Sequence, residues 1–84
     1  MVPSVKPEEF WFRIRMVLRS RDLSLLWLAK TLGRRVRFIQ NRSDANRVTK
    51  KESEEILDAL DLTINDMALP IEVFANKIIG GRSV

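Results

Sequence analysis

Residues 25–42 constrain the fold more than any other part of the chain. Ser24 is a good N-cap for a helix over residues 25–32, and Gly33 is a typical residue for ending that helix. A second segment with apolar residues at helical spacing, about residues 35–42, follows directly. A helix, a glycine turn and a second helix within so few residues predict a helix-turn-helix unit.

Apolar residues recur at helical spacing in the other segments as well. No alternating run is long enough to favour a sheet. Thr49 and Glu52 form a capping box that opens a later helix, and Pro70 interrupts the chain before the last helix. The sequence therefore predicts an all-α fold, a compact bundle of five or six short helices. Its helices outside the helix-turn-helix are expected at residues 7–21, 50–60, 64–68 and 71–79.

The first expected helix carries Phe10 and Ile14 on its apolar face, and its arginines, Arg13 among them, are expected mostly on the other faces. Three parts of the chain can be distinguished. Residues 1–6 are predicted to be a flexible tail, residues 7–69 the helix-turn-helix domain, and residues 70–84 a C-terminal helical extension with a possible role in dimerisation.

The composition excludes several classes of function. Cys, His and Tyr are all absent, so thiolate metal sites, cysteine nucleophiles and the commonest general base are excluded. We expect no enzymatic activity, no metal site and no cofactor. The longest apolar run, residues 25–29, is far shorter than the roughly 20 residues that span a membrane. With no secretory signal pattern at the start, a cytoplasmic location is expected, at the nucleoid when the protein is bound to DNA.

The net charge of +4 conceals a division between the two halves of the chain. Residues 1–51 carry thirteen Lys and Arg against four acids, a net of +9. Residues 52–84 carry two basic residues against seven acids, a net of −5. Such an asymmetry favours a polyanionic partner for the first half, and the alternative is a solvated basic surface that binds nothing.

Several short motifs in a fixed order resemble the XRE family, the Cro and phage-repressor type of helix-turn-helix. A small residue, Ala29, stands where the two helices cross, and Gly33 follows four residues later. The resemblance covers about residues 9–69 and implies a lambda-repressor-like DNA-binding domain. The matching motifs are Leu23-Ser24, Leu28-Ala29, Leu32-Gly33, Ile39 and the downstream pattern Ile56-Leu57-x-Ala59-Leu60-x-Leu62-Thr63-x-x-x-Met67.

The resemblance implies that the second helix of the unit lies in the major groove of double-stranded DNA. Helical geometry places the side chains of Arg37 and Asn41 opposite Ile39, flanked by Gln40 and Phe38. Arg suits guanine and Asn or Gln suits adenine, so these side chains are the candidate base-reading residues, with Phe38 assigned either to a thymine methyl or to the core. The candidate phosphate contacts are Arg34, Arg35, Arg42, Arg47, Lys50 and Lys51.

The chain also departs from the family at three positions. Leu25 replaces a usual polar residue, and Arg34 and Arg42 stand where apolar residues are common. The apolar side chains that follow Leu25 either pack under the C-terminal segment or form an interface with a partner. The residues proposed for a homodimer or partner interface are Trp27, Ile71, Phe74 and Ile78.

Two functions follow from these observations. The first is a sequence-specific DNA-binding transcriptional regulator of phage or bacterial type, most simply a repressor that acts as a homodimer on two half-sites. The alternative is a protein-interaction module on the same fold, such as an antirepressor, adaptor or antitoxin-like protein, that binds a protein through the apolar face and has little affinity for DNA.

Overall fold

The computed structural model describes residues 5–80, and its regular secondary structure in that range is all helix, which confirms the predicted all-α class. Six short helices follow one another with brief connections. They are α1 (Pro7–Ser20), α2 (Leu25–Leu32), α3 (Val36–Asp44), α4 (Lys50–Ala59), α5 (Ile64–Ala68) and α6 (Ile71–Gly80). Among the described residues no helix is long and apolar enough to cross a membrane.

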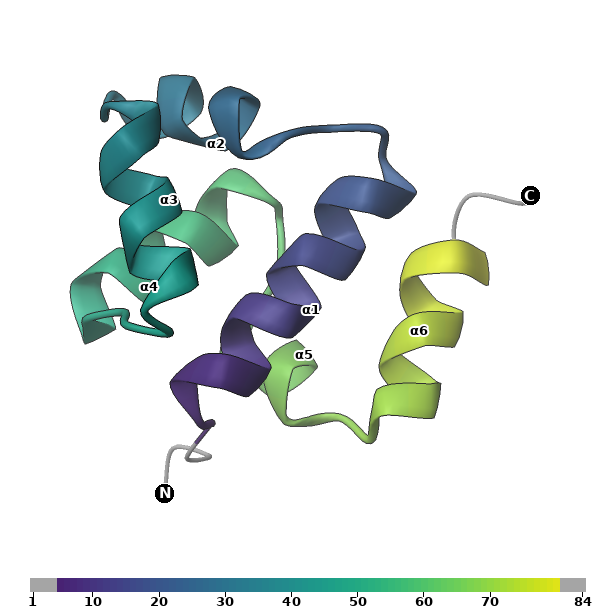
Figure 1. Cartoon of the computed structure of the whole chain (residues 1–84). Helices are drawn as coiled ribbons and strands as arrows, with labels where there is room; N and C mark the ends of the chain where they lie inside the picture. Colours follow the sequence, from purple (N-terminus) through teal and green to yellow (C-terminus); the bar gives the residue numbers. More distant parts are fainter. Residues whose placement is uncertain (1–4, 81–84) are drawn as a thin grey trace.

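Helix α1 lies between two groups of helices (Figure 1). On one side α2 packs closely against both α3 and α4, and on the other side α6 packs against α1. Apolar side chains from every helix meet in one core around α1. The buried members are Phe10, Trp11, Ile14, Val17, Leu18, Leu28, Ala29, Ile39, Ile56, Leu57, Leu60, Met67 and Phe74.

The residues that the sequence predicted as helix caps form those caps in the structure. The Trp27 backbone N–H donates to the Ser24 hydroxyl at 3.2 Å, which caps α2. Gly33 ends α2 in the left-handed conformation, with φ of +70°. At the start of α4, Thr49 and Glu52 exchange hydrogen bonds of 2.9 and 3.1 Å in the capping box. These local interactions separate α2, α3 and α4.

Helix α3 is longer than the sequence predicted. The sequence predicted that this helix ends at about residue 42, but it continues to Asp44. The cause is a contact with α1: the Arg15 Nε donates to the Ser43 hydroxyl at 3.0 Å, and the Arg15 guanidinium lies 3.6 Å from the Asp44 carboxylate. Ser43 is buried by this contact, so the last turn of α3 is held by tertiary structure that local sequence does not show.

The prediction that Arg13 faces solvent with the other α1 arginines is wrong, since only 3% of this residue is exposed. Its guanidinium donates to the Asp66 carbonyl at 3.3 Å and lies 3.7 Å from the Glu9 carboxylate. It also covers the ring of Phe74 on α6. Arginine is rarely buried without such partners, and here the partners come from α5, α6 and α1 itself.

Candidate nucleic-acid interface

Helix α3 exposes one polar stripe. Arg37, Gln40 and Asn41 are all exposed and lie three and four residues apart, which places them on one face of the helix. Ile39, on the opposite face, is buried in the core. Three of the four candidate base-reading side chains therefore share one accessible surface.

Four of the candidate phosphate contacts are exposed close to the ends of α3 and α4. Arg35 is the N-cap of α3, and its side chain makes no capping hydrogen bond. Arg47 is exposed in the connection between α3 and α4, where its carbonyl accepts a 2.9 Å hydrogen bond from the indole of Trp11. Lys50 and Lys51 are exposed on the first turn of α4. In the described part of the chain none of these four side chains takes part in an ion pair.

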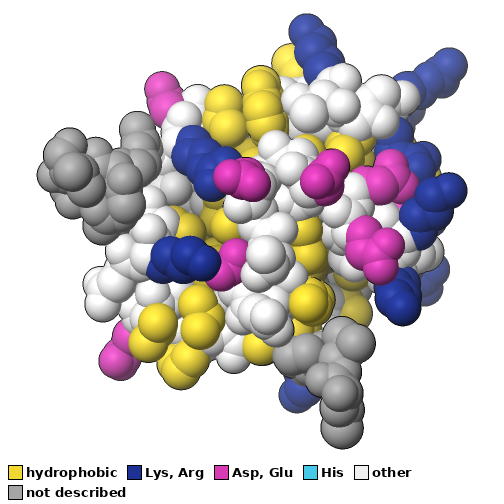
Figure 2. Space-filling model, turned by 180° about the vertical axis from the view of Figure 1, so that it is seen from behind, with side chains coloured by type: hydrophobic (Ala, Val, Ile, Leu, Met, Phe, Trp, Pro, Cys, Tyr) yellow, Lys and Arg dark blue, Asp and Glu magenta, His cyan; other side chains and the backbone are white. Residues whose placement is uncertain are grey.

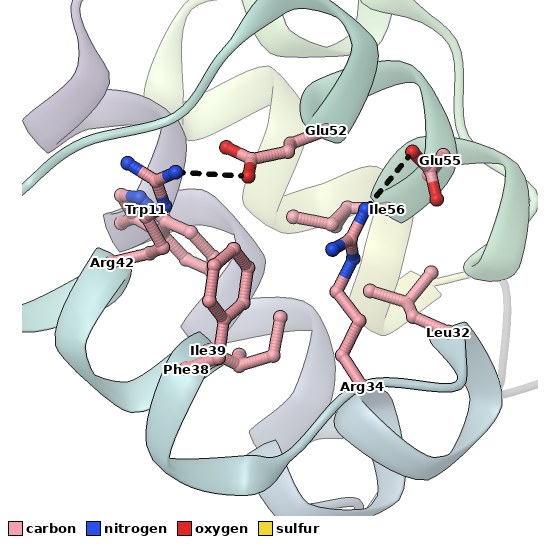
Figure 3. Close-up of a pocket in the computed structure, with 9 residues that line it drawn as sticks. All are labelled: Trp11, Leu32, Arg34, Phe38, Ile39, Arg42, Glu52, Glu55 and Ile56. Atoms are coloured by element: carbon pink, nitrogen blue, oxygen red, sulfur yellow. Dashed lines mark ion pairs between the residues drawn. The ribbon is translucent and has the colours of Figure 1, made fainter.

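The other two candidate phosphate contacts, Arg34 and Arg42, are paired with acids of α4. The Arg34 guanidinium lies 3.7 Å from the carboxylate of Glu55, and that of Arg42 lies 3.3 Å from the carboxylate of Glu52. Both guanidinium carbons also lie close to the centre of the Phe38 ring, at 5.1 Å for Arg34 and 5.0 Å for Arg42. Figure 3 shows Arg34 and Arg42 pointing to these acids, with Phe38 beside them.

Phe38 is half-buried and packs against the core, unlike the three polar side chains of the α3 stripe. Its ring lines a small cavity with Trp11, Ile39 and Ile56. The cavity measures about 10 Å³, which is room for a single water molecule at most. Side chains therefore fill the space between α3 and α4, and the cavity that remains is too small for a ligand.

The apolar residues predicted as an interface are placed unequally. Phe74 is completely buried, Trp27 and Ile78 are half-buried against the core, and Ile71 is 40% exposed. Helix α6 packs against α1 and lies on the other side of α1 from α2 and α3 (Figure 1). Within the apolar run that begins α2, Leu26 is the most exposed side chain, at 47%.

The charge division found in the sequence is also visible on the surface. Figure 2 views the molecule from behind, so α3 and α4 lie towards its right side. Lys and Arg side chains gather along the right edge of this face, with Asp and Glu beside them towards the centre. On this face, most of the basic side chains therefore lie on the side of the molecule where α3 and α4 are.

No match to this chain is found among protein-family models, curated proteins or solved structures. The candidate interface therefore rests on the residues and their geometry.

Three residues that position this interface were not identified from the sequence. The Trp11 indole holds the connection between α3 and α4 through its hydrogen bond to Arg47. Glu55 and Glu52 pair with Arg34 and Arg42, the two arginines beside the Phe38 ring. A partial signal was present for the acids, because residues 52–55 are the first acidic cluster after the basic half of the chain. Nothing local indicated which arginines they pair with.

Proposed function

We propose that the chain is a sequence-specific regulator of transcription that binds double-stranded DNA with α3 in the major groove. The observation that carries this proposal is the exposed stripe of Arg37, Gln40 and Asn41 on a helix that follows α2 after a tight glycine turn. The resemblance to the XRE family supports the same docking geometry. Neither a cofactor nor a metal is needed for such binding.

The chemistry of the stripe suits base edges. Arg37 can donate two hydrogen bonds to guanine O6 and N7, and Gln40 or Asn41 can pair with N6 and N7 of adenine. Each good bidentate contact contributes about 1–3 kcal/mol of discrimination against the wrong base. The three side chains are close enough along the helix to read neighbouring base pairs.

The unpaired cations around the stripe suit the phosphate backbone. Arg35, Arg47, Lys50 and Lys51 would supply affinity and register without choosing sequence. Four phosphate contacts per subunit correspond to a slope of about −3.6 in a plot of log K against log salt concentration. This slope is a quantitative expectation of the proposal.

The proposal includes a homodimer that represses by covering a promoter. Two half-sites on one face of DNA lie about 34 Å apart, so a symmetric dimer would present two α3 helices at that spacing. Ile71 and Ile78 on α6 are the candidates for the dimer contact, and Phe74 serves the core instead. The alternative function as a protein-interaction module is less well supported, because Leu25 and Trp27 are half-buried against the core and Leu26 is the most exposed side chain of that apolar run.

Fluorescence anisotropy with duplex DNA over a salt series tests the proposal. We expect binding that weakens linearly on the logarithmic plot, with a slope near −3.6 per subunit. Arg35→Ala should make the slope shallower by about 1, while Phe12→Ala, on the exposed side of α1, serves as the control that changes no charge. An absence of binding at low salt, or a response that is independent of salt, would rule out the proposed function.

A further inference from the structure

Five residues join α3 and the turn before it to α4 in a contact that we call the clamp: Arg34, Phe38, Arg42, Glu52 and Glu55 (Figure 3). Each guanidinium has both an aromatic and an acidic partner, Phe38 in common and one glutamate each. Arginine is suited to this double role because its planar group stacks on a ring while its N–H groups reach a carboxylate. In the clamp, each arginine therefore stacks its planar group on Phe38 and directs its N–H groups to a glutamate.

The acids of the clamp are held in place by their surroundings. One oxygen of Glu52 accepts from the Thr49 backbone N–H in the capping box of α4, and the other faces Arg42. The Oε1 atom of Glu55 is buried without a hydrogen-bond partner, and it is the oxygen that lies 3.7 Å from Arg34. A buried carboxylate oxygen needs a compensating charge, and Arg34 supplies it.

The clamp also spans a gap between backbones. Among the described helices, α2 packs closely on both α3 and α4. The backbones of α3 and α4 do not pack closely against each other. Long side chains bridge the distance instead. These side chains act together with the packing of α3 on α2 and its contact with Arg15 of α1, and α3 is the helix that carries the exposed stripe.

We propose that the clamp fixes the orientation of α3, so that Arg34 and Arg42 act as positioning residues and do not contact phosphates. The inference rests on the proposed function in one respect, because it is the DNA-reading helix that is positioned. It divides the six candidate phosphate contacts into two classes: four free cations that meet DNA and two clamped ones that hold the reading helix.

The first test uses the free protein and needs no DNA. Glu52→Gln keeps the capping box, since Gln also serves at this position, but removes the charge that faces Arg42. Glu55→Gln does the same to Arg34, and Glu54→Gln is the matched control on the exposed side of α4. We expect backbone amides of residues 36–44 to exchange hydrogen at least about fivefold faster in the first two variants. Unchanged exchange in both would overturn the clamp.

The second test measures binding to duplex DNA, where the two roles predict opposite signs. If Arg34 and Arg42 position α3, Glu52→Gln and Glu55→Gln weaken binding to the preferred duplex and lower its preference over a scrambled duplex by about fivefold or more, the loss of roughly one base contact. If the arginines contact phosphates, freeing them from the acids strengthens binding and steepens the salt slope by about 1. The Glu54→Gln control gives the effect of removing a nearby negative charge alone.

Charge-preserving variants complete the comparison. Arg34→Lys and Arg42→Lys keep a cation for a phosphate but lose the planar group that stacks on Phe38. We expect both to weaken binding and to loosen α3, while Arg35→Lys retains near wild-type binding. Wild-type affinity that survives both clamp substitutions would overturn the inference. If the wild-type protein binds no duplex, the proposed function fails, and the exchange measurement still decides whether the clamp holds α3.

Discussion

The guanidinium of Arg13 on α1 lies 5.0 Å from the centre of the Phe74 ring on α6, and both side chains are buried. The cation covers the aromatic face while the same group donates to the Asp66 carbonyl on α5. One side chain of α1 thus joins the two helices that follow residue 62. This contact ties the C-terminal helix to the core that supports α3.

Replacing Phe74 should destabilise the whole domain. Phe74→Ala removes a completely buried ring and leaves Arg13 without its aromatic cover, so we expect a loss of about 3–5 kcal/mol in the free energy of unfolding. The neighbouring exposed position supplies the control, and Val73→Ala should cost far less. Urea unfolding followed by circular dichroism measures both. Equal and small effects would show that α6 contributes little to the core.

A second prediction concerns acid stability. Burial acts to raise the pKa of Asp66, but the hydrogen bond and positive charge of Lys77, together with the Thr63 backbone N–H, hold this pKa below its ordinary value. A lowered pKa in the folded state means that the stabilisation is complete above the unfolded pKa of about 3.9 and is lost as the pH falls through the folded pKa.

The variant Asp66→Asn tests this direction of the pH dependence of stability. We expect it to be less stable than wild type by about 1–2 kcal/mol at pH 7, a modest value because Lys77 is half-exposed and screened by solvent. The difference should begin to shrink as the pH falls below the unfolded pKa of about 3.9 and should vanish below the lower folded pKa, where the carboxylate of the folded protein is protonated as well. Asp58→Asn, at an exposed site of α4, is the matched control. A difference that grows in acid would contradict the assignment.

The third prediction concerns the free-energy cost of placing a side chain on the left-handed backbone of Gly33, in the turn between α2 and α3. A Cβ atom at residue 33 would meet nothing within 4 Å, so Gly33→Ala introduces no clash and costs only its left-handed φ of +70°. We expect a loss of about 1–2 kcal/mol in stability, and a smaller loss for Gly33→Asn, because asparagine adopts this conformation more readily. Thermal and urea unfolding distinguish the two variants. An alanine variant as stable as wild type would mean that the turn adopts another conformation.

The fourth prediction separates base reading from phosphate contact. On a preferred duplex, Arg37→Ala should lower affinity by about 1–3 kcal/mol and abolish the preference at one base pair. Arg35→Ala should weaken binding to all duplexes to a similar extent. Anisotropy titrations with the preferred duplex and its single-base variants provide the comparison. The same response from both variants would place Arg37 on the backbone of the DNA.

The boundaries of the helices were readable from sequence where local chemistry sets them. Ser24, Gly33 and the Thr49–Glu52 pair act on backbone groups within a few residues, so their types and spacing determine the helix ends. The end of α3 and the burial of Arg13 depend instead on partners 28 and 53 residues away. Such contacts leave no local pattern, so neither could be predicted from the sequence.

The candidate interface, like the helix ends, was only partly predictable from the sequence. Helical periodicity placed Arg37 and Asn41 opposite Ile39, with Gln40 beside them, and the structure exposes all three. Periodicity could not separate the cations that stay free from those that are paired. Arg34 and Arg42 look like Arg35 in the sequence, and only the fold brings Glu55 and Glu52 to them.

Selection of bound sites from a random duplex library tests the central claim most directly. The account predicts enrichment of a defined short sequence, arranged as an inverted repeat with half-sites centred about one helical turn apart. Selection with Arg37→Ala should return the same repeat with one position relaxed. Recovery of random sequence with the wild-type protein at low salt would contradict the claim that α3 reads DNA.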